Sequence, residues 1–575
     1  MGFSPIAWSR GGRLRPYLAV AAAVALGAGA AAGATAASAT TSSTATFAGY
    51  HAPSTASTTL YRGSTTTPIK HLVVIFDENE SFDHYFGTYP YAANTDGTPF
   101  KAKPGTPTVN GLYSKITKSG PVGPLLTHNP NEYNPQRLTH DQALTSDQNH
   151  DYTPEQEAQN NGKMDMFVQE TEDSTPANGC ASPQYCPPGI VMDYFDGNTT
   201  TALWNYAQYY SMSDNNWDTT YGPSTPGAIN VTSGNTAGAE ALNPSWDPTD
   251  PGQVTTSTDI ADGTLYSDED PYYDACSDKE HTTDGALASL SGKNVGDLLN
   301  ASHVTWGWFE GGFAPTGTTG GLPVCGSSHE NIAGAPVTDY VPHHEPFQYY
   351  ASTANPDHLA PSALNKIGYT DQANHQYDLS YFSDALDGKG GAKLPSVSYL
   401  KASAYQDGHP GYSDPLDEQT FLVNTINSIE QSKYWASTAI VITYDDSDGW
   451  YDHQSPISAH ALVNGSNDAT IDTAMCEATS ITVGDNNGRC GYSQRLPMLV
   501  ISPWTRQNYV SSNLTDTASV VKFIENNWLS GERISGSFDA SSGSLDGWNG
   551  LLDFNTRPNF KPLILNPATG AVVGS

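Results

Sequence analysis

Two short apolar runs constrain the fold of this chain more than any other feature: residues 71–76, His-Leu-Val-Val-Ile-Phe, and residues 439–444, Ala-Ile-Val-Ile-Thr-Tyr. Short runs that are rich in β-branched residues and hardly alternate in polarity are typical of strands buried on both faces of a parallel sheet. The first is followed by Asp-Glu-Asn and the second by Asp-Asp-Ser-Asp. Because ligands bind beyond the carboxyl ends of strands in open α/β sheets, we expect both ends to form one cation site.

Further strands and helices are expected between and after these runs. Residues 304–309 and 496–501 are two more strand candidates, and residues 295–300 have the pattern of a helix end. One helix is predicted from the N-cap Asp414 to about Trp435, and another from a cap at Asp516 to about Trp528. This alternation predicts an α/β fold with a central, mainly parallel sheet flanked by helices. Long loop insertions are also expected, the largest at about residues 230–285.

The N-terminus has the composition of an export signal. A basic start precedes an apolar stretch over 18–32, and the small-residue triplet at 37–39 is the favoured cleavage site. The stretch is short for a membrane span, which favours secretion over a stable membrane anchor. The predicted organisation is a signal peptide over 1–39, a flexible leader rich in Ser, Thr and Ala over 40–66, and a single catalytic domain over 67–575.

The formal net charge is −35, from 25 Lys and Arg against 60 Asp and Glu. This balance argues against binding to nucleic acids or anionic membranes, both of which attract basic proteins. It does not exclude a phosphorylated substrate, because a metal ion and a few His side chains supply local positive charge. Most of the carboxylates are expected on a solvated surface.

Six Cys in an exported chain indicate disulfides. Local spacing favours Cys180–Cys186 and Cys476–Cys490, which leaves Cys276 to pair with Cys325. The chain has no C-x-x-C pair, which argues against a structural zinc site.

Three kinds of residue are candidates for chemistry. Oxygen ligands follow the two acidic runs, although acidic residues also simply begin loops after strands. A turn over 221–227, Tyr-Gly-Pro-Ser-Thr-Pro-Gly, holds a Ser that is either a nucleophile or an ordinary turn residue. His side chains near a metal could bind phosphate oxygens or protonate a leaving group, whereas a lone His is more often a surface residue. The candidates are His150, His343, His344, His358, His409 and His453.

Residues 78–87, Glu-Asn-Glu-Ser-Phe-Asp-His-Tyr-Phe-Gly, resemble the E-N-x-S-F-D-H-Y-F-G signature of the bacterial phosphoesterase family. That family contains secreted phospholipases C and broad-specificity acid phosphatases, and its fold is similar to that of alkaline phosphatase. Further blocks that resemble the family are residues 161–165, 222–227, 343–350, 405–412 and 444–453. The resemblance therefore extends over most of the chain and implies a bacterial, secreted or extracytoplasmic enzyme.

The resemblance also implies roles for individual residues. The family's metal ligands match Glu78, Asn79, Asp445 and Asp446, and its Ser or Thr nucleophile matches Ser224. The histidines that surround the phosphate in the family match His150, His343, His344 and His409. The implied cofactor is one divalent ion, which could be Mg, Mn, Ca, Fe or Zn.

The second acidic block separates two branches of the family. Asp-Asp-Ser-Asp-Gly-Trp-Tyr-Asp-His, residues 445–453, resembles the acid phosphatase branch, whereas phospholipases C more often carry D-E-H/N-G-G-F-Y-D-H. We therefore expect hydrolysis of phosphate monoesters through a phospho-Ser intermediate. The alternatives are a phospholipase C that cleaves phosphatidylcholine-type diesters and, ranked lower, a secreted sugar- or surface-binding protein. The expected partner is a phosphorylated small molecule or lipid.

Overall fold

The computed structural model describes residues 65–160, 162–175, 180–243, 254–257, 259–261, 263–277, 286–456 and 492–574. All of them belong to one compact unit, Leu60–Ser575. The predicted signal peptide and nearly all of the predicted leader lie outside the described residues.

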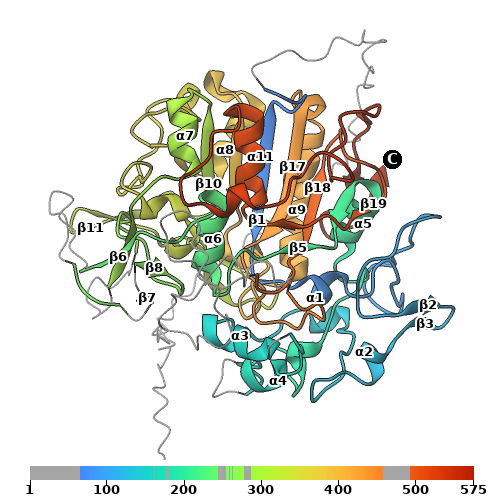
Figure 1. The fold of residues 1–575 in the computed structure, drawn as a ribbon. Helices are drawn as coiled ribbons and strands as arrows, with labels where there is room; N and C mark the ends of the chain where they lie inside the picture. The colour runs from blue at the N-terminus through green and yellow to red at the C-terminus, as the bar shows by residue number, and fades with distance from the viewer. Residues whose placement is uncertain are drawn as a thin grey trace, which may run out of the picture. The chain divides into compact units, whose positions relative to one another are not determined.

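An eight-stranded sheet forms the centre of the fold (Figure 1). Both runs singled out in the sequence lie at its middle, where β1 pairs in parallel with β17 along its whole length and with β16 on the other side. β18 is antiparallel to both neighbours, and the other pairings are parallel. In spatial order the strands are β15 (Gln376–Asp378), β10 (Trp306–Glu310), β16 (Val397–Lys401), β1 (His71–Asp77), β17 (Thr438–Tyr444), β18 (Met498–Ile501), β4 (Ser211–Ser213) and β19 (Tyr509–Ser511).

The sheet is buried on both faces, as its apolar strands predict. Successive side chains of a strand point to opposite faces. Val73 and Ile75 accordingly pack into one core with residues of α5, α8 and α9. Leu72, Val74 and Phe76 pack into a second core with residues of α6, α7 and α11. The structure thus confirms the predicted α/β architecture, with helices on both faces of a mainly parallel sheet.

The α-helices of the described residues are α1 (Phe82–Phe86), α2 (Pro124–Thr127), α3 (Tyr152–Gln159), α4 (Phe167–Glu170), α5 (Thr201–Tyr209), α6 (Ser224–Thr232), α7 (Val295–Ala301), α8 (Ser380–Asp387), α9 (Pro415–Glu430) and α11 (Ser519–Trp528). Short 3-10 helices are η1 (His140–Gln142), η2 (Ile190–Met192), η3 (Pro342–His344), η4 (Pro346–Tyr349), η5 (Leu364–Lys366), η6 (Lys389–Gly391), η7 (Ala404–Gln406), η8 (Trp435–Ser437) and η9 (Phe538–Ala540).

The predicted start of α9 is confirmed, whereas its predicted end and the predicted start of α11 are not. Asp414 caps α9 as expected, because its side chain accepts hydrogen bonds from the backbone N–H groups of Leu416 and Asp417. The helix ends at Glu430 rather than near Trp435, which lies in η8. The predicted cap at Asp516 is wrong: its carboxylate accepts hydrogen bonds from the hydroxyls of Tyr492 and Ser542, and α11 begins at Ser519.

Small two-stranded sheets build the insertions. Their strands are β2 (Lys115–Thr117), β3 (Gly120–Val122), β5 (Asn216–Trp217), β6 (Ala239–Leu242), β7 (Ile260–Ala261), β8 (Thr264–Leu265), β9 (Leu287–Leu290), β11 (Gly317–Thr319), β12 (Leu322–Val324), β13 (Ser328–Glu330), β14 (Pro336–Thr338), β20 (Thr515–Asp516), β21 (Ile564–Leu565) and β22 (Val572–Gly574). Three of these strands, β6, β7 and β8, lie within the predicted 230–285 insertion.

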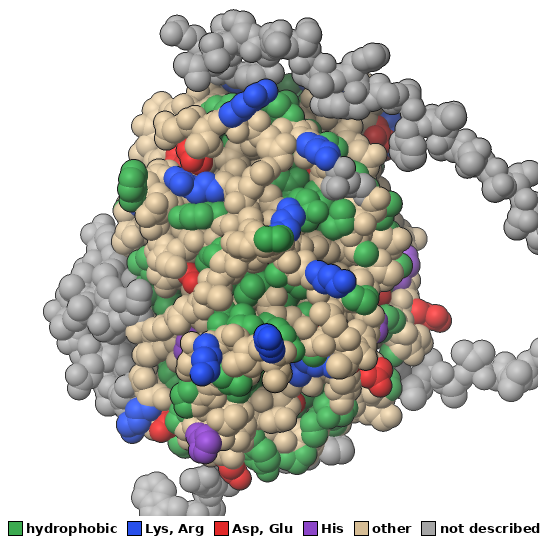
Figure 2. Space-filling model, turned by 90° about the vertical axis from the view of Figure 1, so that its right-hand side faces the viewer, with side chains coloured by type: hydrophobic (Ala, Val, Ile, Leu, Met, Phe, Trp, Pro, Cys, Tyr) green, Lys and Arg blue, Asp and Glu red, His purple; other side chains and the backbone are tan. Residues whose placement is uncertain are grey.

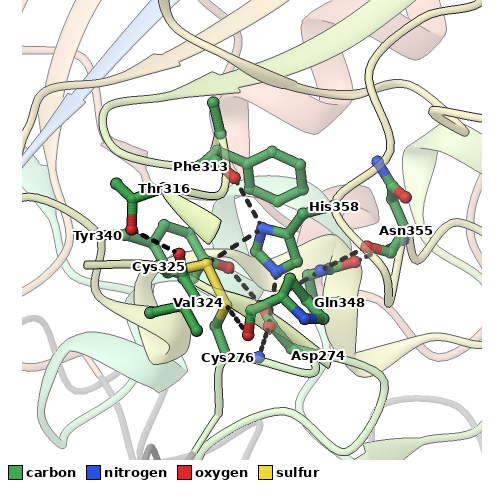
Figure 3. Close-up of a disulfide and its surroundings, with 12 residues drawn as sticks. Asp274, Cys276, Phe313, Thr316, Val324, Cys325, Tyr340, Gln348, Asn355 and His358 are labelled. Atoms are coloured by element: carbon green, nitrogen blue, oxygen red, sulfur yellow. Dashed lines mark hydrogen bonds and ion pairs between the residues drawn. A yellow bond between two sulfur atoms is a disulfide. The ribbon is translucent and has the colours of Figure 1, made fainter. Parts of the chain in front are cut away.

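Two disulfides, Cys180–Cys186 and Cys276–Cys325, confirm two of the three predicted pairs. The third, Cys476–Cys490, lies outside the described residues. Beside Cys325 lies His358, whose Nε2 is 2.7 Å from Asp274 Oδ1 (Figure 3). The other oxygen of Asp274 accepts a hydrogen bond from Gln348 of η4, so this disulfide region holds the insertion against the segment that follows the His343–His344 pair.

Charges are distributed between the surface and the interior in an unexpected way. On the face drawn in Figure 2, Lys and Arg side chains are scattered among uncharged surface instead of forming one continuous patch. Many carboxylates are buried, contrary to the expectation of a mainly solvated acidic surface. Within the described part of the chain, the buried Lys and Arg side chains are two, Lys401 and Arg495. In that same part, none of the helices combines the length and apolarity needed to cross a membrane.

Candidate active site

The carboxyl ends of β1 and β17 bring the four predicted metal ligands together. Glu78, Asn79, Asp445 and Asp446 are all fully buried. The backbone N–H groups of Asn79 and Asp446 both donate to Asp445 Oδ1, at 2.8 Å each. Asn79 has a φ of 62°, a left-handed conformation that Asn tolerates better than most residues and that turns the chain sharply after the strand.

Ser224 is the first residue of α6 and faces these ligands. Its Oγ lies 3.0 Å from Glu78 Oε2, 3.3 Å from Asp446 Oδ2 and 3.4 Å from Asn79 Oδ1. The N-terminus of a helix favours negative charge, so this position suits a serine alkoxide or a phosphoryl group. The predicted turn therefore continues into a helix.

Close packing of α6 against Asp445, the residue after β17, holds Ser224 near the predicted ligands. A Cβ atom at Gly227 would lie 2.2 Å from the carbonyl oxygen of Asp445. Real Cβ atoms do not come so near to backbone, and therefore a side chain at this position would push α6 and Ser224 away from the ligands.

Three of the four predicted histidines lie next to the predicted metal ligands, two beside Asn79 and one beside Glu78. His150 Nε2 and His409 Nε2 lie 3.4 and 3.2 Å from Asn79 Nδ2. His344 Nδ1 lies 3.4 Å from Glu78 Oε1. His343 lies farther out, where its Nδ1 is 3.4 Å from Asp270 and its side chain is 26% exposed.

Burial and neighbouring charges move the pKa values of these groups apart. Burial lowers the pKa of His409 and, together with the neighbouring His343, lowers that of His344 well below its usual value. Burial would also lower the pKa of His150, but the carboxylates of Asp446 and Asp448 outweigh it and raise that pKa. Burial and the adjacent Asp445 raise the pKa of the Asp446 carboxyl well above its ordinary range.

The donor set fits a hard divalent cation. Carboxylate, amide and hydroxyl oxygens converge here, and such ligands suit Mg²⁺, Mn²⁺ or Ca²⁺. Asp445 Oδ2 is buried and has no hydrogen-bond partner among the described residues, which is costly unless a further group binds it. Ligand atoms of Glu78, His344 and Asp407 also lie within 4.8 Å of one another.

Several residues that build this site were missed from the sequence. Lys401, at the end of β16, contacts Glu78 Oε1 through its ammonium group. Glu155 of α3 accepts hydrogen bonds from the Ser447 hydroxyl at 2.7 Å and the Gly222 N–H at 3.2 Å. A Lys directly after the strand-like residues 397–400, Val-Ser-Tyr-Leu, was a local signal for Lys401. Glu155 gave no comparable signal, because its partners come from distant segments.

The other histidine candidates lie outside the site. His358 belongs to the disulfide region, and His453 Nδ1 is 2.5 Å from Asp83 Oδ2. Asp83 and Asp452 also bind the buried guanidinium of Arg495, at 3.3 and 3.0 Å. This cluster ties α1 to the loop after β17, and thereby the segments that follow the two ligand pairs.

The model of the Phosphoesterase family matches residues 69–529. The chain belongs to this family. Phosphoesterase relatives include a non-hemolytic phospholipase C of Pseudomonas aeruginosa, 33% identical over 139 residues, which are 23% of this chain and 20% of the relative. The hemolytic phospholipase C of the same organism is 23% identical over 81% of this chain and 53% of its own length. Phospholipase C B of Mycobacterium tuberculosis is 21% identical over 80% of this chain and 73% of its own length.

The family is named for phosphoric ester chemistry, and the relatives reported above are named phospholipases C. The chain spans about a fifth of the non-hemolytic relative and about half of the hemolytic one. The matched region includes the ligand segments, α6 and the histidine blocks.

Proposed function

We propose that this protein is a secreted, metal-dependent hydrolase of phosphate monoesters that acts through a phospho-Ser224 intermediate. The observation that carries the proposal is the position of Ser224 Oγ, within 3.4 Å of oxygens of Glu78, Asn79 and Asp446 at the start of α6. A hydroxyl in such a setting is activated when its proton is released and the resulting charge is stabilised. A divalent ion bound by Glu78, Asn79, Asp445 and Asp446 would supply that stabilisation and neutralise phosphate charge.

The chain's own residues would perform two displacements. Ser224 Oγ gives its proton to a hydrogen-bonded carboxylate, Glu78 or Asp446, and forms a bond to phosphorus while the bond to the leaving oxygen breaks. The alcohol departs with a proton from a nearby His. A water oxygen then attacks phosphorus as the bond to Ser224 Oγ breaks, and one proton of that water passes to the same His. Ser224 recovers its own proton from the carboxylate, and inorganic phosphate leaves. His150, His343, His344 and His409 would hold phosphate oxygens, and His150, the neighbour of His409 whose pKa is raised, would protonate the leaving group.

A monoester suits this site because it carries one more charged oxygen than a diester. The imidazoles of His150 and His409 both lie next to the Asn79 amide and would provide nitrogen donors for such an oxygen. Phospholipase C activity on phosphatidylcholine-type diesters is the second candidate. It is favoured by the relatives, which are named phospholipases C.

Parallel assays test both candidates. The wild-type chain is compared with Ser224→Ala on p-nitrophenyl phosphate and on phosphatidylcholine, with Ser428→Ala on the exposed side of α9 as the matched control. We expect Ser224→Ala to lower kcat/KM by at least about 10³-fold, and the control to match wild type. Faster turnover of the monoester supports the first candidate, whereas faster release of phosphocholine would support the second. Retained activity in Ser224→Ala would overturn the nucleophile assignment.

A further inference from the structure

Lys401 is a buried cation within the candidate active site. It is the last residue of β16, the strand that pairs with β1 on the side opposite β17. Its side chain is 1% exposed, and its ammonium contacts Glu78 Oε1. Burying an ammonium group costs free energy unless it is paired with an opposite charge, so carboxylates are needed to offset the burial of Lys401.

The surroundings of Lys401 are strongly acidic. Asp445, Asp407, Asp77 and Asp446 all act on it electrostatically. Asp77 is fully buried, and neither of its carboxylate oxygens has a hydrogen-bond partner among the described residues. Arg495, the other buried base of the described chain, is engaged with Asp83 and Asp452. Lys401 is therefore the buried ammonium available to these carboxylates.

Glu78 presents its two oxygens to different partners. Oε2 lies 3.0 Å from Ser224 Oγ, on the side of the other predicted ligands. Oε1 contacts Lys401 and lies 3.4 Å from His344 Nδ1. Glu78, His344 and Asp407 have ligand atoms close enough to hold a cation of their own. The Lys401 ammonium thus meets Glu78 at the oxygen that a second cation would bind.

We propose that the Lys401 ammonium takes the place of a second metal cation by binding Glu78 Oε1. The site then has room for one divalent ion. This inference rests on the proposed metal site of Glu78, Asn79, Asp445 and Asp446. Lys401 is a positioning residue here: by fixing Oε1 it orients Oε2 toward Ser224. Removing the ammonium should open a second place for a divalent ion and misalign Glu78.

The test is a titration of the full chain with Mn²⁺. Electron paramagnetic resonance measures the free Mn²⁺, and calorimetry measures the binding stoichiometry and affinity. Lys401→Ala and Lys401→Met remove the charge, Lys401→Arg keeps it, and Lys433→Ala changes an exposed Lys away from the site. We expect about one Mn²⁺ per chain for wild type, Lys401→Arg and Lys433→Ala, and about two for Lys401→Ala and Lys401→Met. We also expect kcat of Lys401→Ala to fall about 100-fold and to recover in part with added ethylammonium, which should displace the second Mn²⁺.

Each other outcome has a defined meaning. Lys401→Ala and Lys401→Met variants that bind only one Mn²⁺ per chain would overturn the inference, whatever their kcat. Loss of all Mn²⁺ binding in folded Lys401→Met would overturn it as well, since Lys401 would then build the first site rather than fill a second. A wild-type chain that binds no Mn²⁺, or a Glu78→Gln variant that binds it unchanged, would instead overturn the proposed metal site. Circular dichroism checks that every variant is folded.

Discussion

At the scale of single residues, the geometry of the site depends on which partner each carboxylate oxygen binds. Asp445 Oδ1 accepts two backbone hydrogen bonds, and its other oxygen is left without a described partner. Glu78 divides its oxygens between Lys401 and Ser224. Side chains that never touch Ser224 also matter, and Glu155 is the clearest case. Its carboxylate binds Gly222, two residues before Ser224, and Ser447, which directly follows Asp446.

Glu155→Ala should lower kcat without unfolding the chain. Loss of both contacts frees the turn before Ser224 from the loop after β17, and a misplacement of about 1 Å costs on the order of 100-fold in rate. Steady-state kinetics on p-nitrophenyl phosphate and thermal unfolding would measure the effect. Glu157→Ala, on the exposed side of the same helix, is the control and should match wild type. A Glu155→Ala enzyme with wild-type kcat would show that Glu155 does not position Ser224.

At the scale of elements, the fold brings strand ends together and then locks the segments that follow them. β1 and β17 pair over seven positions, from His71 with Thr438 to Asp77 with Tyr444, so their ends are level. Beyond those ends, the buried Arg495 binds Asp83 of α1 and Asp452 of the loop after β17. This guanidinium group thus adds a second link between the two ligand segments, besides the hydrogen bond from Asn79 to Asp445.

Arg495→Ala should destabilise the protein by about 3–5 kcal/mol, since it leaves the carboxylates of Asp83 and Asp452 buried without their partner. Urea unfolding at neutral pH would give the change in the free energy of unfolding. Arg557→Ala is a suitable control because Arg557 is exposed, and its effect should stay within about 0.5 kcal/mol. Equal stability of Arg495→Ala and wild type would contradict the assigned role of this cluster.

The strands and helices were predicted from the sequence better than the side-chain contacts between distant segments. The acidic ends of β1 and β17 were recognisable because ligand and strand are adjacent in the chain. Lys401 and Glu78 are separated by 323 positions, and Glu155 and Ser447 by 292, so no local pattern joins them. The cap at Asp516 failed for a related reason: tertiary contacts with Tyr492 and Ser542 took the carboxylate that local pattern assigned to the helix.

At the scale of the whole molecule, the buried carboxyl groups should make stability depend on pH. Glu430, at the end of α9, accepts a hydrogen bond from the Tyr210 hydroxyl at 2.6 Å, and burial raises the pKa of its carboxyl to about 8. The folded state therefore holds a proton that the unfolded state releases near pH 4.5. This contribution to stability is full below about pH 4.5 and is lost as the pH rises through 8.

Glu430→Gln should accordingly flatten the pH dependence of the unfolding free energy. One proton held by the folded state and absent from the unfolded state gives a slope of about −1.4 kcal/mol per pH unit between pH 5 and 8. Urea unfolding across that range would show wild type losing stability more steeply than the variant. Glu532→Gln, at an exposed position, should keep the wild-type slope. The same slope in wild type and Glu430→Gln would mean that Glu430 is ionised throughout.

Ser224 is proposed to accept the phosphoryl group, and trapping the phosphorylated protein tests this role directly. Wild-type protein is mixed with p-nitrophenyl phosphate, quenched in acid within milliseconds, digested and analysed by mass spectrometry. We expect a peptide that carries one added phosphoryl group on Ser224, formed in wild type and absent from Ser224→Ala. Turnover with no phosphorylated peptide in wild type, or with the phosphoryl group on another residue, would contradict this role.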